Sequence, residues 1–346
     1  PYTTLFRSLP QLVENQYDKR VSTVASVLIV IAWIGIIAGQ IVAAGKIIGI
    51  IGIGNKTVWM LVFTVVFTGY TIIGGQRANL RTDAFQLAII FIGLVAALII
   101  VLSTLGGWNG LRAGLPADHF SFPLSENFGG YELVSWLLLF GMTYLIGPDM
   151  YTRLFSAKNE RVARNSALIA AVLVVPFALC IVLLGMSAKV LFPEMSSAEA
   201  ALPSLIWDQL PPVAGGLVLA AFAGAMMSSA DTCLVSTGAI ISNDIVKKII
   251  PSLSEARAVL VARMAIIMIS VLALLLALRL GSVISSLMFA YAVYTGGIAI
   301  PVLAGFYREK LKLTPLGAVA AVSGGGIAAL LSKLFEVRYL DLGALG

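Results

Sequence analysis

Residues 223–248 read AGAMMSSADTCLVSTGAIISNDIVKK, an apolar stretch of helical length that carries hydroxyl groups and a carboxylate. At 3.6 residues per turn, positions i, i+3, i+4 and i+7 share one face of a helix. Here these positions are Ala225, Ser228, Ser229 and Thr232. Asp231 lies beside them, and a carboxylate within a bilayer is costly unless a cation or another partner compensates it. Because hard cations are held by oxygen ligands, the stretch predicts a membrane helix with an ion-binding face.

Hydroxyl groups in a membrane helix have a second explanation. Serine and threonine often bond back to the carbonyl four residues earlier, or join neighbouring helices. For an isolated serine this structural role is the better interpretation. Several hydroxyls clustered around Asp231 favour an ion site instead.

The chain as a whole has the composition of a polytopic membrane protein. Of its 346 residues, 59% are hydrophobic and 12% are charged, whereas soluble domains carry roughly 25% charged residues. Apolar runs of about 20 residues, each able to cross about 30 Å of hydrocarbon, recur along the chain. We expect an all-α, multi-pass protein of the cell (plasma or inner) membrane with nine such segments: 21–45, 57–74, 84–105, a short one at 133–147, 167–189, 213–246, 258–280, 283–307 and 316–334.

The net charge of +6 does not indicate a nucleic-acid partner, because the basic residues lie in short connections rather than in one stripe. The positive-inside rule accounts for them: alternate connections place most of them on one side, with Lys19 and Arg20 in the cytoplasm. Cys180 and Cys233 lie within apolar runs, where packing is the expected role. The sequence lacks a His/Cys metal cluster, a GxSxG elbow, a phosphate-binding glycine loop and HExxH, so we do not expect an enzyme.

Both ends of the chain read as cut, and we expect a fragment. The sequence starts at Pro1 rather than Met and stops at Gly346 where another apolar run begins. Residues 1–8, PYTTLFRS, are similar to a translated sequencing adapter and are excluded from the fold prediction. Residues 9–346 are expected to form one transmembrane domain.

Three further places could take part in binding. Asp83 lies at a predicted helix start near the cytoplasmic face, where capping the helix and a role in ion exit are equally good interpretations. The short segment 133–147 is interrupted at Gly141 and ends at Gly147, and broken membrane helices free backbone groups for ligands. Residues 289–301 read FAYAVYTGGIAIP, whose aromatic side chains are expected either to pack between helices or to line a pocket. The candidate solute-binding residues from these two segments are Gly141, Tyr144, Phe289, Tyr291 and Tyr294.

These motifs together resemble the sodium:solute symporter family, whose members transport proline, pantothenate, sugars, sialic acid, iodide and monocarboxylates. The resemblance covers nearly everything after residue 8. It is carried by LPQLVENQYDKR (9–20), GYTIIGGQRANLRTDAFQ (69–86), DMYTRLFSAKNERVAR (149–164), MSSADTCLVSTGAIISNDIVKK (227–248), AYAVYTGGIAIPVLAGFYREK (290–310) and TPLGAVAAVSGGG (314–326).

The resemblance implies an inverted-repeat (LeuT-like) transporter core. The nine segments would correspond to core helices three to ten and one further helix, with the first two core helices lacking. It also implies Na⁺ as the coupling ion, held by the carbonyl of Ala225 and the hydroxyls of Ser228 and Ser229. Asp83, Asp231 and Thr232 match positions that form a second ion site in some members. A carboxylate at position 231, where other members have serine, leaves a second Na⁺, a proton or charge balance open.

The expected function is Na⁺-coupled symport of a small organic solute across the lipid bilayer. Residues 167–185 hold no charge or amide, and Val293 stands where sugar transporters of the family have glutamine, so a sugar is disfavoured. An organic acid, an amino acid or a pantothenate-like solute fits better. Two alternatives stay open: a proton-coupled symporter, and a transporter-like input domain of a sensor histidine kinase.

Overall fold

The computed structural model describes residues 8–52, 54–74, 79–126, 128–147, 157–195 and 197–334. Within these ranges the regular structure is helical, apart from a single bridge between Ser125 and Phe128. Eight helices of the described part are long and apolar enough to cross a membrane, and a ninth apolar helix is shorter. All nine apolar segments expected from the sequence are therefore helical, and the fourth is short as predicted.

The spanning helices follow the chain in order. They are α2 (Lys19–Ile50), α3 (Lys56–Gly74), α4 (Asn79–Thr104), the short α6 (Gly130–Ile146), α8 (Glu160–Leu191), α10 (Pro212–Ala239), α12 (Glu255–Leu280), α13 (Val283–Tyr294) and α16 (Pro315–Leu334). Two of them continue through π-helical turns: α10 through η4 (Ile240–Val246) into α11 (Lys247–Ile249), and α13 through η5 (Thr295–Ala299) into α14 (Ile300–Gly305). The short connecting helices are α1 (Leu9–Gln16), α5 (Gly107–Ala113), η2 (Ala117–Phe120), η3 (Ala198–Ala200), α9 (Ala201–Gln209) and α15 (Arg308–Leu311).

Side-chain caps fix where several of these helices begin. The carboxylate of Asp18 accepts hydrogen bonds from the N–H groups of Arg20 (2.9 Å) and Val21 (3.0 Å) at the start of α2. Asn159 caps α8 in the same way. These caps satisfy N–H groups that have no partner within the helix. Gly281 ends α12 in a left-handed conformation (φ 63°), so the chain turns at once into α13.

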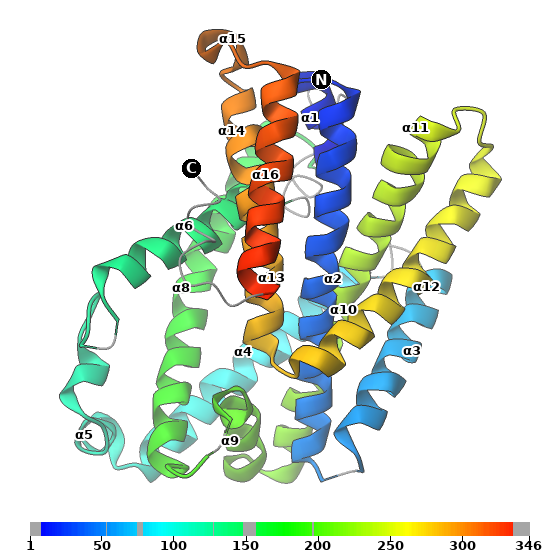
Figure 1. Ribbon diagram of the computed structural model, residues 1–346. Coiled ribbons are helices and arrows are strands. Elements are labelled where there is room, and N and C mark those ends of the chain that lie inside the picture. Colours follow the sequence, from blue (N-terminus) through cyan, green and yellow to red (C-terminus); the bar gives the residue numbers. More distant parts are fainter. Residues whose placement is uncertain are drawn as a thin grey trace.

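The two ends of the bundle carry different connections. Figure 1 shows α1, α11 and α15 at one end and α5 and α9 at the other. Lys247, Arg308 and Lys310 therefore lie at the end where α2 begins, as the alternation of spans predicts. We call this the basic end and, after the orientation that the positive-inside rule predicts, the other the exterior end.

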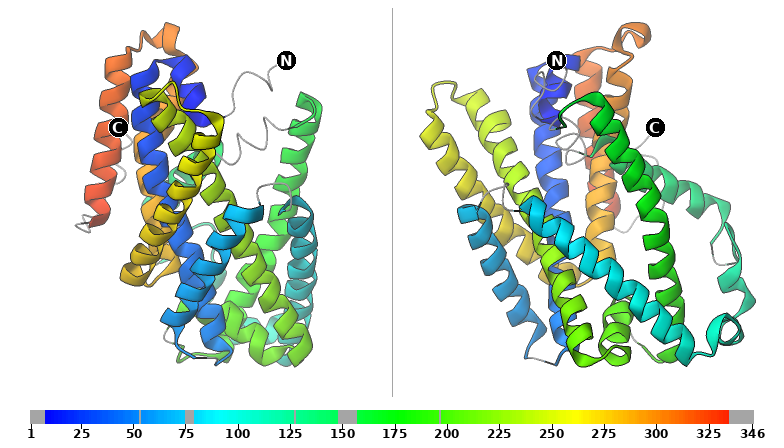
Figure 2. Two further views of the ribbon diagram at one scale, coloured as in Figure 1. Left: turned by 90° about the vertical axis from the view of Figure 1, so that its right-hand side faces the viewer. Right: turned by 180° about the vertical axis from the view of Figure 1, so that it is seen from behind.

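Helix α2 is the centre of the packing. It contacts α3, α10, α12, α13 and α16, and side chains along its whole length, such as Ile29, Ile37 and Ile41, are fully buried. Its contact with α13 is close because a Cβ on Gly35 would sit 2.8 Å from Cδ1 of Phe289. By contrast α8 lies at the periphery, where it packs against α4 (Figure 2) through stacked rings of Phe91 and Phe177.

The exterior connection between α8 and α10 is tied to the core by Glu199. Its carboxylate accepts hydrogen bonds from Lys46 Nζ at the end of α2 and from Ser282 Oγ (2.7 Å), Val283 N (3.1 Å) and Ile284 N (2.8 Å) at the start of α13. Burial alone would raise the pKa of Glu199, but these four hydrogen bonds outweigh it and lower the pKa from 4.5 to about 2. The exterior ends of α2 and α13 are thus joined through one carboxylate.

One sequence-based expectation about the chain stays a prediction. Residues 1–7 lie outside the described residues, so the division into residues 1–8 and 9–346 rests on the sequence. Ser8 caps α1, accepting from Gln11 N at 3.3 Å. Cys180 and Cys233 are free cysteines that pack among apolar side chains.

Candidate functional site

The predicted polar face lies on a regular α-helical part of α10. Its residues differ in exposure: Ser229 is exposed, Ser228 and Thr232 are half-buried, and the side chain of Asp231 is 1% exposed. Positions 229 and 231 point in different directions because two residues correspond to about 200° of helical rotation. The sequence pattern therefore divides into an open hydroxyl face and a buried carboxylate.

The hydroxyls of α10 also make the local bonds that the alternative interpretation predicts. Thr232 Oγ1 donates to the carbonyl of Ser228 at 3.0 Å, and Thr237 Oγ1 donates to that of Cys233 at 2.5 Å. A hydroxyl that donates its hydrogen keeps two lone pairs, so its oxygen can still bind a cation. Back-bonding and ion binding are compatible for Thr232.

A cavity of about 280 Å³ opens beside this face, between α2, α6, α10 and α13. Ser229 and Thr232 line it from α10, and three predicted aromatic residues line it from α6 and α13: Tyr144, Tyr291 and Tyr294. The cavity thus joins the polar face of α10 to aromatic residues of two other helices. None of the described residues that line it is charged.

The end of α6 is held against α13 and η5 by hydrogen bonds around the cavity. The Tyr294 hydroxyl donates to the carbonyl of Ile146, the last residue of α6, which the end of the helix leaves without a helical partner. Thr143 Oγ1 lies 2.8 Å from Thr295 Oγ1. The ring of Tyr291 meets that of Phe140 edge-on, with centroids 5.3 Å apart. The short fourth segment therefore ends at the cavity wall. The expected interruption at Gly141 is wrong, because α6 is a continuous helix from Gly130 to Ile146.

Two predicted solute-binding residues lie outside the cavity lining. A Cβ on Gly141 would have no neighbour within 4 Å, and Phe289 packs against Gly35 of α2. Their assignment to solute binding stays a sequence-based prediction.

The sequence reasoning missed the lining residues of α2 and one of α6, namely Ala32, Trp33, Ile36, Gln40 and Thr143. Gln40 carried a usable signal because it is the one amide within the apolar segment 21–45. Trp33 and Ile36 carried none, since apolar residues are expected throughout such a helix.

Close contacts fix the register of α4 against α10. A Cβ on Gly93 would sit 2.2 Å from Val218 Cγ2, and one on Gly224 would sit 2.4 Å from Gln86 Nε2. The later residue of α4, Gly93, lies against the earlier residue of α10, Val218, so the two helices are antiparallel here.

This register places Asp83 near the polar face. One turn back along α4 from Gln86 corresponds to one turn forward along α10 from Gly224, which brings the backbone of Asp83 to the level of Ser228. The side chain of Asp83 lies outside the described part of the structure. Its role in a second ion site with Asp231 and Thr232 stays a prediction.

The residue types of the polar face suit Na⁺ better than a transition metal. Among the described residues, no group of three or more His, Cys, Asp or Glu side chains lies together. Carbonyl and hydroxyl oxygens, such as those of Ala225, Ser228 and Ser229, are the hard ligands that alkali and alkaline-earth cations prefer.

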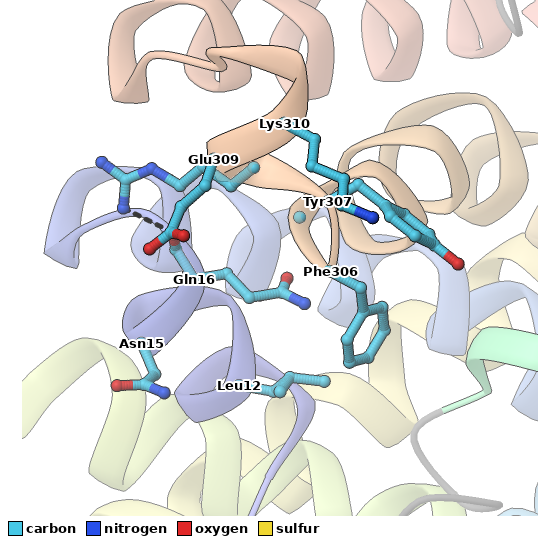
Figure 3. Close-up of a pocket in the computed structure, with 9 residues that line it drawn as sticks. Leu12, Asn15, Gln16, Phe306, Tyr307, Glu309 and Lys310 are labelled. Atoms are coloured by element: carbon cyan, nitrogen blue, oxygen red, sulfur yellow. Dashed lines mark hydrogen bonds between the residues drawn. The ribbon is translucent and has the colours of Figure 1, made fainter.

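A larger opening of about 610 Å³ lies at the basic end, between α1 and the connection of α14 to α15 (Figure 3). It is distant in the chain from the polar face and contains none of its residues. Arg308 Nη1 donates to the carbonyl of Gln16 at 2.6 Å, the dashed bond in Figure 3, and its guanidinium lies 5.8 Å from the centre of the Tyr17 ring. Arg308 therefore fixes the end of α1 to α15.

Comparison with known proteins identifies relatives over nearly the whole chain. The model of the sodium:solute symporter family matches residues 6–325. A sodium/glucose cotransporter of Vibrio parahaemolyticus is 26% identical over 367 residues, which cover 95% of this chain and 67% of the relative. A sodium/pantothenate symporter of Escherichia coli (strain K12) is 25% identical over 347 residues, covering 96% and 70%.

The fold also has a solved counterpart. A structure described as the substrate-bound outward-open state of a Na⁺-coupled sialic acid symporter superposes with a TM-score of 0.76, covering 99% of this chain and 76% of that one at 19% identity. The helical architecture is thus that of the inverted-repeat (LeuT-like) transporters. Sodium is the coupling ion that the family description and these relatives name. The matched family model, the nine apolar helices and the shared fold together show that this chain belongs to the sodium:solute symporter family.

Proposed function

We propose that this protein carries out Na⁺-coupled symport of a small organic solute: an organic acid, an amino acid or a pantothenate-like compound. The observation that supports this most strongly is the cavity of about 280 Å³ that joins Ser229 and Thr232 to three tyrosines. A polar ion-binding face on one side of a largely apolar pocket allows ion and solute to bind next to each other.

The pocket chemistry bears on the solute class. Its described lining offers one amide, Gln40, together with hydroxyls and aromatic rings, and no charged side chain. A polyhydroxylated sugar needs many polar partners in a site that excludes water. A solute with an apolar body and a few polar groups is better matched to this lining.

In the proposed cycle Na⁺ binds the carbonyl of Ala225 and the hydroxyls of Ser228 and Ser229, and the solute then binds in the adjacent cavity. Alternating access releases both on the other side. One charge moving through about 100 mV supplies roughly 2.3 kcal/mol, and a tenfold Na⁺ gradient adds about 1.4 kcal/mol. One ion per solute would sustain a gradient of several hundredfold, on the order of 500.

Uptake by the complete protein, including the core helices that this chain is expected to lack, tests this proposal in proteoliposomes. An inward Na⁺ gradient should drive accumulation of radiolabelled pantothenate, proline or lactate, and Ser228→Ala or Ser229→Ala should abolish it. Ser270→Ala on α12 is the matched control, because it removes a buried hydroxyl that bonds to Ile266 O (2.8 Å) away from the cavity. Wild-type rates in both α10 variants would exclude this sodium site.

Proton coupling is the second candidate because Asp231 is a buried carboxylate beside the hydroxyl face. Uptake measured at acidic pH with Na⁺ replaced by choline separates the two mechanisms. Undiminished uptake under these conditions would favour the proton, whereas loss of uptake supports Na⁺.

A further inference from the structure

Gln40 occupies an unusual place for an amide. It lies in α2, the central helix of the bundle, and its neighbours within one turn are apolar residues and glycine. Gln40 follows Ala32, Trp33 and Ile36 on one helical face, and all four line the cavity beside α10. The amide is therefore directed into the pocket by the same face that supplies its apolar wall.

The position of Gln40 along the cavity follows from the contact between α2 and α13. A Cβ on Gly35 would meet Phe289 and Ala290, whereas one on Gly39 would meet Leu287. The helices run antiparallel, so Gln40 lies level with the first turns of α13. It is therefore nearer than Trp33 to the exterior end, where Lys46 meets Glu199.

Within the described part of the structure, the amide of Gln40 makes no hydrogen bond to protein, and the residue is only half-buried. Other polar residues of the lining are already paired: Thr143 with Thr295, Thr232 with Ser228, and Tyr294 with Ile146. The polar atoms of Gln40 are not among the buried side-chain atoms without a partner, so the amide stays accessible from the cavity. A hydrogen bond from a solute to this amide would contribute about 0.5–1.5 kcal/mol net to binding.

We propose that Gln40 binds the solute directly and determines which solutes are accepted. A glutamine amide both donates and accepts, so its best partner is a neutral group that also does both, such as an amide or a hydroxyl. The transported solute then carries that group at the end facing the exterior and an apolar body against Trp33 and Tyr291. This inference rests on the proposed symport function, whose sodium ligands lie on a different helix.

The test compares Gln40→Leu, which removes the hydrogen bond at similar volume, with Gln40→Asn, which restores a shorter amide. Na⁺-driven uptake is measured for lactate and for propionate, two acids that differ only in a hydroxyl. In the wild type lactate should have the lower KM. Gln40→Leu should raise the KM for lactate about tenfold, the effect of one hydrogen bond of about 1.4 kcal/mol. The maximal rate and the KM for propionate should stay within about twofold, and Gln40→Asn should recover part of the preference.

The same comparison is made with pantothenate, which carries an amide and hydroxyls. Unchanged KM values in Gln40→Leu, with intact Na⁺-driven uptake, would overturn the role of Gln40 and leave the symport function standing. An equal loss of maximal rate for every solute, with no recovery in Gln40→Asn, would show a structural role and also overturn it. Absence of Na⁺-driven uptake of every one of these solutes by the complete wild-type protein would refute the proposed function itself.

Discussion

Replacing Glu199 by glutamine should separate the exterior ends of α2 and α13 while keeping the shape of the side chain. The carboxylate accepts from Lys46 Nζ, Ser282 Oγ and the first two N–H groups of α13. Glutamine has one acceptor oxygen and places an NH₂ group against the remaining donors. At least one hydrogen bond is lost, and the Lys46 ammonium loses its counter-charge.

The magnitude follows from the pKa. Lowering the pKa of Glu199 from 4.5 to about 2 corresponds to about 3.4 kcal/mol of stability at neutral pH. The side chains of Glu199 and Lys46 are 12% and 16% exposed. Partial screening by solvent therefore reduces the expected loss of stability to about 2 kcal/mol. For a protein of 346 residues the melting temperature should fall by roughly 3 °C.

Thermal unfolding of both proteins in detergent, measured by intrinsic fluorescence between pH 3 and pH 8, checks this value. A carboxylate with a lowered pKa stabilises the folded state above its unfolded pKa of about 4.5 and loses that effect as the pH falls towards about 2. The gap between wild type and Glu199→Gln should therefore be constant from pH 8 to about pH 5.5 and then shrink progressively.

Glu194→Gln is the matched control, because Glu194 is an exposed residue of the same connection. It should change the melting temperature by less than about 1 °C. The reasoning would be refuted by a gap below 1 °C at pH 7 for Glu199→Gln, or by a gap that grows as the pH falls below 4.

Three more predictions concern packing and the ion site. Gly35→Ala should destabilise the protein by about 1–3 kcal/mol, because its Cβ would sit 2.8 Å from Phe289 Cδ1 and 3.0 Å from Ser286 O. Gly39→Ala is the control and should be nearly neutral, because its Cβ would have no contact under 3.5 Å. Equal melting temperatures for the two variants would contradict the close contact between α2 and α13. Arg308→Lys should lower stability by about 1–2 kcal/mol in the same assay, because lysine cannot reproduce the bonds to Gln16 O and Leu313 O, and an unchanged melting temperature would show that these bonds contribute little. Asp231→Asn should reduce the number of Na⁺ ions per solute, measured by parallel ²²Na⁺ and solute fluxes, if that carboxylate holds a second ion; an unchanged stoichiometry rules this out.

The nine apolar segments were predictable from the sequence because hydropathy is a local property. Each run of about 20 residues has to form a helix, since backbone polar groups in lipid need partners within the segment. The bounds were less accurate: α2 continues to Ile50 beyond the predicted end at residue 45, and α8 begins at Glu160 rather than 167. The extra turns of α8 are capped by Asn159, and the extra turn of α2 begins at the charged Lys46, so hydropathy alone does not show them.

The sequence by itself determined the membrane class, the helices and the polar face of α10, because composition and periodicity act within one segment. Only the tertiary structure decided which of these residues share a site. In the folded protein Asp231 is buried, whereas Ser229 and Thr232 line a cavity. Gln40 and Trp33, from a helix nearly 200 residues earlier in the chain, line the same cavity. The physical reason is that helix register depends on close contacts between distant segments, such as Gly35 with Phe289 and Gly224 with Gln86. Such contacts leave no periodic signal in either segment alone.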